Sequence, residues 1–144
     1  MKHQKLETDI QTSKRMANVH LKGGKAETIL AKALWHEGIH YRKNFKELPG
    51  SPDIAITKYK IAVFVDGEFW HGHNWDKRKL TLKRNREYWI EKIEENMIRD
   101  KKNDQKLIKI GWIPLHFWEK DVLKNTSNCL ETILNLIKKQ YKKL

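Results

Sequence analysis

The chain has 144 residues and a mass of 17.3 kDa, enough for one hydrophobic core and too little for a second catalytic domain. Lys and Arg number 30 against 18 Asp and Glu, and the resulting net charge of +12 predicts a polyanionic partner, with nucleic acid ahead of an anionic membrane surface. A single cysteine, Cys129, excludes an internal disulfide and a multi-cysteine zinc site. Without a signal-peptide pattern or a long apolar stretch, we expect a cytoplasmic protein.

The spacing of apolar residues predicts alternating helices and strands. In chain order we expect helices over 10–20 and 26–37, a strand near 39–42, a turn over 48–52, a hairpin of strands over 53–57 and 61–66, a loop over 67–76, a long helix over 81–110, an edge strand over 112–118 and a final helix before a basic tail. This order indicates an α/β fold in which helices flank both faces of a central mixed β-sheet.

The positive charge is concentrated in two segments. Residues 77–109 carry twelve basic and six acidic residues, and residues 1–25 carry six and two. Taken singly, these side chains are typical of solvated helix faces. Because the two segments flank a balanced, aromatic-rich centre, their position favours a nucleic-acid groove around a site.

Two aspartates fall where the long predicted helix should be apolar. Its apolar stripe passes through Ile93 and Met97 and then through Asp100 and Asp104. An aspartate that faces a core without a partner is strongly destabilising. For Asp100 we expect a partner, His71; for Asp104 a partner and the end of the buried face are equally open.

Two more carboxylates lie at the ends of the predicted hairpin. Asp53 begins one strand and Asp66 ends the next, so the hairpin should bring them together. One or two carboxylates beside a polyanion suit Mg²⁺, which keeps several waters and neutralises phosphate charge. With Glu68 the spacing is similar to a Pro-Asp…Asp-x-Glu nuclease signature, although an ordinary hairpin with polar ends has the same pattern.

Five segments, in order, resemble the very-short-patch-repair (Vsr) DNA mismatch endonucleases: SKRMANVHLKGGKAE, LPGSPDI, IAVFVDGEFWHGHNW, NREYWIEKIEENMIRDKKND and LIKIGWIPLHFWEKD. The resemblance covers about residues 13–120. It implies a restriction-endonuclease-like core, Mg²⁺ as cofactor, and nicking of duplex DNA beside the thymine of a T·G mismatch. We therefore expect one Vsr-like endonuclease domain over residues 1–144, with a DNA-contacting segment at 1–25 and a basic tail at 138–144.

Carried over to this chain, the resemblance implies the site residues. Asp53 and the backbone carbonyl of Val65 would bind the metal, His71 would be the general base, and Asp100 would orient it. Glu27 would lie near the same site, although a glutamate in the first turn of a helix is also favoured by the helix dipole. The family commonly has a second histidine where this chain has Asp66, which leaves Asp66 as a further candidate metal ligand and puts the leaving-group step in question.

The resemblance also implies wedges that enter the base stack, because unstacking is least costly at a mismatch. These residues are Met16, Phe69, Trp70 and Trp89, and the alternative for Phe69 and Trp89 is that they are simply core. Phosphate contacts are expected from Lys77, Arg78, Lys79, Arg84 and Arg86.

The family's structural zinc is not expected here. Glu68, Trp75 and Lys120 occupy its three cysteine positions, which leaves only His73. In its place we expect an ion pair between Glu68 and Lys120, unless Glu68 turns toward the metal.

The partners implied are double-stranded DNA, mismatch-repair proteins and a cognate cytosine-5 DNA methyltransferase, with no membrane, for a monomeric enzyme. The alternatives are a restriction, nicking or homing-type endonuclease on the same fold and a catalytically dead DNA-binding module.

Overall fold

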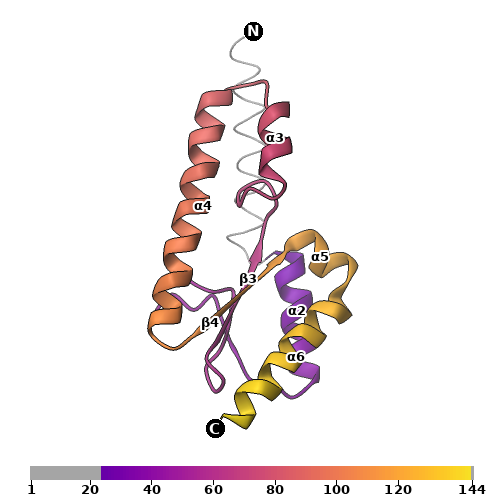
Figure 1. The fold of residues 1–144 in the computed structure, drawn as a ribbon. Helices are drawn as coiled ribbons and strands as arrows, with labels where there is room; N and C mark the ends of the chain where they lie inside the picture. The colour runs from indigo at the N-terminus through magenta and orange to yellow at the C-terminus, as the bar shows by residue number, and fades with distance from the viewer. Residues whose placement is uncertain (1–23, 144) are drawn as a thin grey trace.

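The structure is a computed structural model that describes residues 24–143 (Figure 1), so Met16 and the helix predicted over 10–20 lie outside the described residues. In chain order the elements are α2 (Lys25–His36), β1 (Arg42–Lys43), β2 (Ile54–Ile56), β3 (Ile61–Asp66), α3 (Trp75–Thr81), α4 (Arg86–Lys109), β4 (Ile113–Trp118), α5 (Glu119–Lys124) and α6 (Thr126–Lys142). None of these helices is long and apolar enough to cross a membrane.

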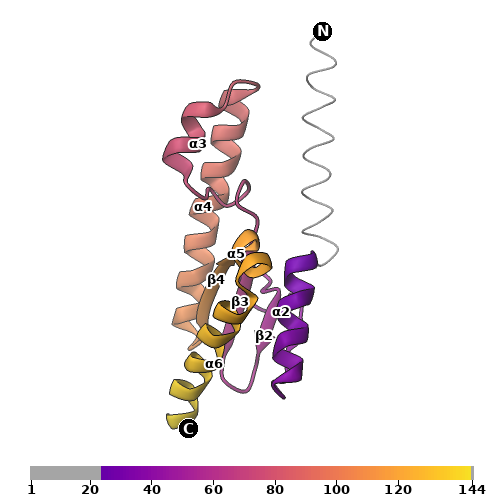
Figure 2. The ribbon, with the colours of Figure 1, turned by 90° about the vertical axis from the view of Figure 1, so that its right-hand side faces the viewer.

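The four strands form one mixed sheet in the order β1-β2-β3-β4. The β1–β2 and β2–β3 pairs are antiparallel, whereas β3 and β4 are parallel and are connected through α3 and α4. Helix α4 lies on one side of the sheet and α2 and α6 lie on the other (Figures 1 and 2). The predicted α/β class, the hairpin and the edge position of β4 are confirmed.

The alternation of side chains along β3 creates two unequal cores. Ile61, Val63 and Val65 belong to the larger core, which α2, α5 and α6 cover, while Ala62 and Phe64 pack with Leu107 of α4. All six residues of β3 are buried, as expected for an apolar strand covered on both faces. By the same alternation Asp66, the last residue of β3, faces α4.

Helix α2 buries one side against the sheet because Ala26, Leu30 and Leu34 recur every four residues. Its chain leaves the helix at Gly38, which adopts φ +77°. The helix predicted over 26–37 is confirmed, and Glu27 is placed in its first turn and buried, at 4% exposure.

The helix predicted over 81–110 begins later than expected. Thr81 instead ends the separate short helix α3, Leu82 is extended, and Asn85 has φ 49°, a left-handed conformation that a continuing helix does not allow. The strand predicted near 39–42 is shifted to Arg42–Lys43. Helix α6 continues through Lys142, so most of the predicted basic tail is helical.

A side chain added at Gly72 would meet strain and a close contact together. Its φ is +72°, and a Cβ there would overlap the sulfur of Met97, whose side chain would have to move. We expect Gly72→Ala to lower the free energy of unfolding by about 2 kcal/mol, since it combines left-handed strain with the displacement of Met97. Gly38→Ala is the matched control: its φ is +77° but nothing lies within 4 Å of the added Cβ. Urea unfolding should show a loss of only about 1 kcal/mol for the control, and equal losses for the two variants would contradict the steric argument.

Candidate active site

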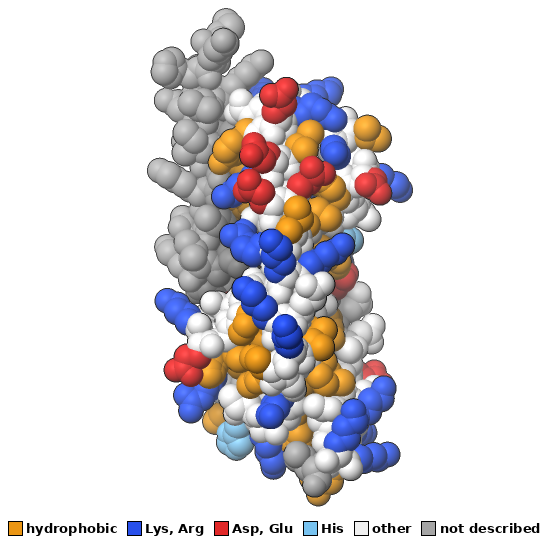
Figure 3. Space-filling view, turned by 60° about the vertical axis from the view of Figure 1, so that its left-hand side comes forward, with side chains coloured by type: hydrophobic (Ala, Val, Ile, Leu, Met, Phe, Trp, Pro, Cys, Tyr) orange, Lys and Arg blue, Asp and Glu red, His pale blue; other side chains and the backbone are white. Residues whose placement is uncertain are grey.

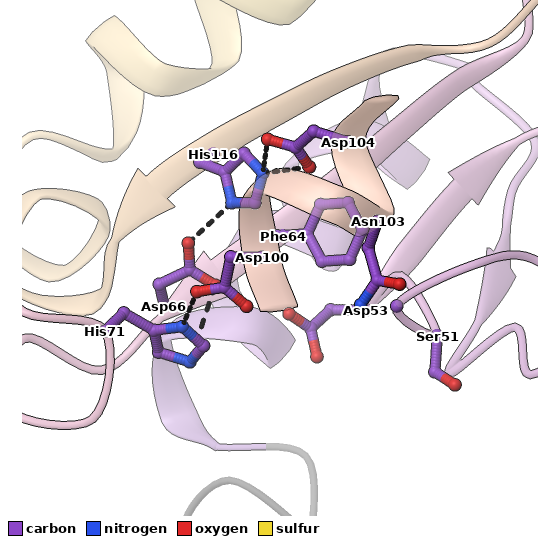
Figure 4. A pocket seen from close by; sticks show the side chains of 10 residues that line it. Ser51, Asp53, Phe64, Asp66, His71, Asp100, Asn103, Asp104 and His116 are labelled. Atoms are coloured by element: carbon purple, nitrogen blue, oxygen red, sulfur yellow. Dashed lines mark hydrogen bonds and ion pairs between the residues drawn. The ribbon is translucent and has the colours of Figure 1, made fainter. Parts of the chain in front are cut away.

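A pocket lies where the end of β3 meets the second half of α4 (Figure 4). Gly50, Ser51, Phe64 and Asn103 form part of its wall, and its ionisable lining residues are Asp53, Asp66, His71, Asp100, Asp104 and His116. These six come from the turn before β2, from β3 and the loop after it, from α4 and from β4. The pocket therefore collects four carboxylates and two imidazoles from segments far apart in the sequence.

Asp53 and Asp66 are brought together at the buried end of the hairpin. The backbone N–H of Val65 donates a hydrogen bond of 2.7 Å to Oδ2 of Asp53. Both carboxylates are largely buried, at 7% exposure for Asp53 and 6% for Asp66. The bond ties the carboxylate before β2 to the strand that ends on Asp66, so both acids face the same pocket.

The structure pairs His71 with Asp100, as the apolar stripe predicts. Nδ1 of His71, in the loop after β3, lies 2.5 Å from Oδ2 of Asp100 on α4, and Nε2 lies 3.8 Å from Oδ1 of Asp66. Burial lowers the pKa of His71, but the hydrogen bond to Asp100 and the charge of Asp66 outweigh it, so the pKa is raised. With Nδ1 committed to Asp100, Nε2 is the ring atom oriented toward the pocket.

Sequence reasoning did not find His116, the second imidazole of the pocket. Its Nδ1 lies 2.6 Å from Oδ2 of Asp66 and its Nε2 lies 2.7 Å from Oδ1 of Asp104. Burial lowers its pKa, but the hydrogen bonds and charges of the two carboxylates raise it to about 9. Asp104, for which the sequence left two alternatives, therefore has a partner.

Glu27 lies beside Asp53 from the α2 side. Burial first, and the charge of Asp53 second, raise its pKa to about 7, although Lys43 acts in the opposite sense. Its Oε1 is buried and has no hydrogen-bond partner among the described residues. Lys43 therefore offsets the charge of an ionised Glu27 only in part, which is the condition that a bound cation relieves.

The donor set fits Mg²⁺. Across residues 24–143 no group of three or more His, Cys, Asp or Glu side chains is arranged to hold a metal ion. Mg²⁺ needs only one or two protein carboxylates because it retains several waters. Asp53 and Asp66, with the buried and unsatisfied Glu27 close to Asp53, supply hard oxygen ligands of that kind.

Glu68 and Lys120 meet, but not as the expected ion pair. Oε1 of Glu68 accepts a hydrogen bond of 2.7 Å from the backbone N–H of Lys120, in the first turn of α5. The expectation was wrong about the donor because first-turn N–H groups have no partner within their helix, and the helix dipole favours a carboxylate there. Nearby, the ring of His73 lies 4.5 Å from that of Trp118. The carboxylate thus links the loop after β3 to α5.

The three aromatic residues expected to act as wedges form a cluster with Tyr88. The rings of Phe69, Trp70 and Trp89 lie 5.3 to 5.6 Å apart in edge-to-face geometry. Trp89 is buried, at 8% exposure, and Phe69 and Trp70 are half-buried. Tyr88, which sequence reasoning did not single out, is 58% exposed and packs 5.0 Å from Trp89. In this structure the cluster is therefore packed against itself, with Tyr88 as its exposed member.

The basic residues expected to contact phosphate have different surroundings. Lys77, Arg78 and Arg84 are exposed, whereas Lys79 pairs with Glu94 at 3.2 Å. Arg86 donates to the backbone carbonyls of Lys79 and Leu82 and so links α3 to the start of α4. Because of these two hydrogen bonds, Arg86 has a structural role besides any contact with DNA.

On the surface, Lys and Arg are spread over the face shown in Figure 3, while most acidic side chains lie at its upper end.

A mixed α/β sheet that presents carboxylates and a carboxylate-bound imidazole at one strand end is typical of a hydrolytic nuclease. Comparison with known proteins identifies the family: the family model described as DNA mismatch endonuclease Vsr matches residues 5–77. The chain belongs to the Vsr family, and it is a DNA endonuclease with DNA as its partner.

Individual relatives agree with this assignment. The type II nicking enzyme V.HpaIIP of Haemophilus parainfluenzae is 56% identical over 104 residues, 72% of this chain and 74% of its own length. The type II nicking enzyme V.NmeDIP of Neisseria meningitidis is 48% identical over 131 residues, 91% and 88% of the two chains. The DNA mismatch endonuclease Vsr of Escherichia coli is 35% identical over 107 residues, 74% and 68% of the two chains.

Glu27 should make the metal-free protein less stable as pH rises. A carboxyl whose pKa is raised from 4.5 to about 7 on folding lowers stability progressively across that interval. In buffer that contains a chelator, we expect the free energy of unfolding of Glu27→Gln to exceed that of wild type by on the order of 3 kcal/mol at pH about 8. Below pH about 4.5 the two proteins should be similarly stable. Urea unfolding at both pH values measures this difference. Glu37→Gln, at an exposed position, is the control, and a Glu27→Gln difference that does not change with pH would contradict the prediction.

The Glu68 contact gives a separate prediction. Because Oε1 binds a backbone N–H, Glu68→Ala should lower the free energy of unfolding by about 1 kcal/mol. Lys120→Met removes the ammonium and keeps the N–H, so it should have almost no effect. Denaturant titration of both variants distinguishes the backbone hydrogen bond from an ion pair. A larger decrease in the free energy of unfolding for Lys120→Met than for Glu68→Ala would favour the ion pair instead.

Proposed function

We propose that this endonuclease nicks one strand of duplex DNA in a Mg²⁺-dependent reaction, and that its substrate is the T·G mismatch of very-short-patch repair. The observation that carries the proposal is the convergence of Asp53, Asp66, His71 and Asp100 in one pocket. DNA binding alone would need none of these carboxylates, which repel a phosphate until a cation compensates them. Their concentration therefore favours catalysis over a DNA-binding module.

Asp53 and the backbone carbonyl of Val65 are the proposed metal ligands, with Asp66 as a further candidate. Bound Mg²⁺ supplies charge neutralisation and polarisation of the scissile phosphate. Asp53 is suited to this role because the Val65 N–H already fixes one of its oxygens. Glu27, which is buried beside Asp53, adds negative charge on the α2 side when it is ionised.

His71 takes the proton from the attacking water in this proposal. Asp100 holds Nδ1 at 2.5 Å, so the ring cannot turn away from the pocket without breaking that bond. The carboxylate also stabilises the imidazolium that forms when Nε2 accepts a proton. Asp100 is therefore a positioning residue for the base.

The aromatic cluster and the basic residues provide the proposed DNA contacts. Phe69, Trp70 and Trp89 act as wedges at the weakened step, with Met16 from the segment outside the described residues. Lys77, Arg78 and Arg84 are exposed for phosphate contacts, and Lys79 and Arg86 can add to them. A single-strand nick needs one such site, so a monomer is sufficient. Mismatch-repair proteins and a cytosine-5 DNA methyltransferase that creates the deamination-prone base are the partners proposed for a cytoplasmic enzyme.

The printed names of the relatives bear on the substrate. Two high-coverage relatives are named type II nicking enzymes and the Escherichia coli relative a DNA mismatch endonuclease. Both names fit a one-strand cut. A nicking enzyme that does not depend on a mismatch is therefore the second candidate function.

Nicking of supercoiled plasmid and of defined duplexes tests the proposal. We expect Mg²⁺-dependent nicks from wild type, a loss of at least roughly 1,000-fold in Asp53→Ala, and normal rates in the control Asp121→Ala, at an exposed acid on α5. A T·G duplex should be nicked faster than its T·A counterpart.

Two other outcomes are informative. Equal rates on T·G and T·A duplexes would contradict the mismatch preference and favour the second candidate. DNA binding without cleavage of any substrate by wild type would overturn the catalytic proposal.

A further inference from the structure

Asp66 stands between two imidazoles, and they hold it unequally. Its Oδ2 is 2.6 Å from Nδ1 of His116, a short hydrogen bond, whereas its Oδ1 is 3.8 Å from Nε2 of His71. The first distance is within hydrogen-bond range and the second is beyond it. Figure 4 shows the two rings on either side of the carboxylate. The position of Asp66 is therefore set from the His116 side.

His116 is itself fixed on three sides. Its ring stacks on Phe64 with 4.6 Å between centroids and an interplanar angle of 10°. Its Nε2 meets both oxygens of Asp104, at 2.7 and 2.8 Å. Because β3 and β4 are parallel and Phe64 lies opposite His116, the strand register also fixes the position of the His116 backbone. The imidazole is therefore held in the place from which it bonds to Asp66.

A released Asp66 would have a nearby alternative partner. Its side chain is only 9% exposed, so water cannot readily replace a lost hydrogen bond. Nε2 of His71 lies within about 1 Å of hydrogen-bond distance. Since Asp100 already holds Nδ1, capture of Nε2 by Asp66 would leave His71 bonded to a carboxylate at each nitrogen and poorly placed to accept a proton from water.

We propose that His116, supported by Asp104, is a positioning residue of the nuclease site that holds the Asp66 carboxylate away from Nε2 of His71. The inference rests on the proposed function for its effect on nicking, but the holding itself is a property of the pocket alone. Asp104 acts one step further out, through His116. Acids and imidazoles thus alternate in the order Asp100, His71, Asp66, His116, Asp104. In this row, His116 and Asp104 keep Asp66 from bonding to His71.

The test uses His116→Phe, which keeps a ring for the stack on Phe64 and removes both hydrogen bonds. We expect the nicking rate at saturating DNA and Mg²⁺ to fall roughly 10- to 100-fold, with the dissociation constant for DNA unchanged. Asp104→Asn should fall in the same direction by less. His36→Phe, the same substitution at an exposed histidine on α2, should match wild type.

A double-variant comparison asks whether the effect passes through Asp66. Asp66→Ala with His116→Phe should nick no more slowly than Asp66→Ala alone. A rate for His116→Phe within twofold of wild type, or a further full loss in the double variant, would overturn the proposal.

Side-chain ¹⁵N NMR of the metal-free protein supplies a readout independent of activity. His116→Phe should shift the Nε2 resonance of His71 toward that of a carboxylate-bound nitrogen, and in the Asp66→Ala background it should leave that resonance in place. No shift, or the same shift without Asp66, would overturn the inference. If wild type nicks no DNA, the proposed function fails while this measurement still decides the role of His116.

Discussion

The parallel pairing of β3 with β4 decides which side chains face α4, and the site depends on that choice. It sets Phe64 opposite His116 and puts Asp66 on the same side of the sheet, toward Asp100 and Asp104. A register shift of one residue would exchange the two faces of β3. Asp66 would then point away from α4, and an apolar residue such as Val65 would face α4 in its place. The larger core behind β3, formed with α2 and α6, makes such a shift very unfavourable. Packing on one face of the sheet therefore secures the chemistry on the other.

The pocket concentrates negative charge that the protein only partly neutralises. Four carboxylates line it with two imidazoles, and Glu27, which is not among the lining residues, adds negative charge near Asp53 from the α2 side when it is ionised. Each imidazole has a raised pKa because carboxylates surround it. The remaining excess weakens the folded state, and a bound cation would relieve it. The chain as a whole is strongly basic, with a net charge of +12, so the same molecule can attract DNA while its pocket repels a phosphate until a cation compensates the carboxylates.

The sequence predicts much of this arrangement, and the exceptions have physical causes. The pairing of His71 with Asp100 is predictable because an acid interrupts an apolar stripe and the family resemblance names its partner. The role of His116 cannot be predicted in this way, because it depends on the register between two strands about fifty residues apart in the chain. No local sequence pattern encodes that register. The start of α4 is missed because Asn85 takes a left-handed conformation in a segment whose composition suits a helix throughout. For Glu68 the sequence correctly brings the loop to Lys120 but does not reveal that the backbone, not the ammonium, is the donor.

That last contact bears on the chemical robustness of the loop that carries His71. A carboxylate oxygen bound to an amide N–H has no thiolate to oxidise and no metal ion to lose. Among all 144 residues the only sulfhydryl is that of Cys129, which lies on α6 and is buried in the larger core. The loop that carries His71 is thus joined to α5 by a link that neither oxidants nor chelators attack directly. A chelator can then remove a bound metal ion without breaking this link, and oxidising conditions leave it intact.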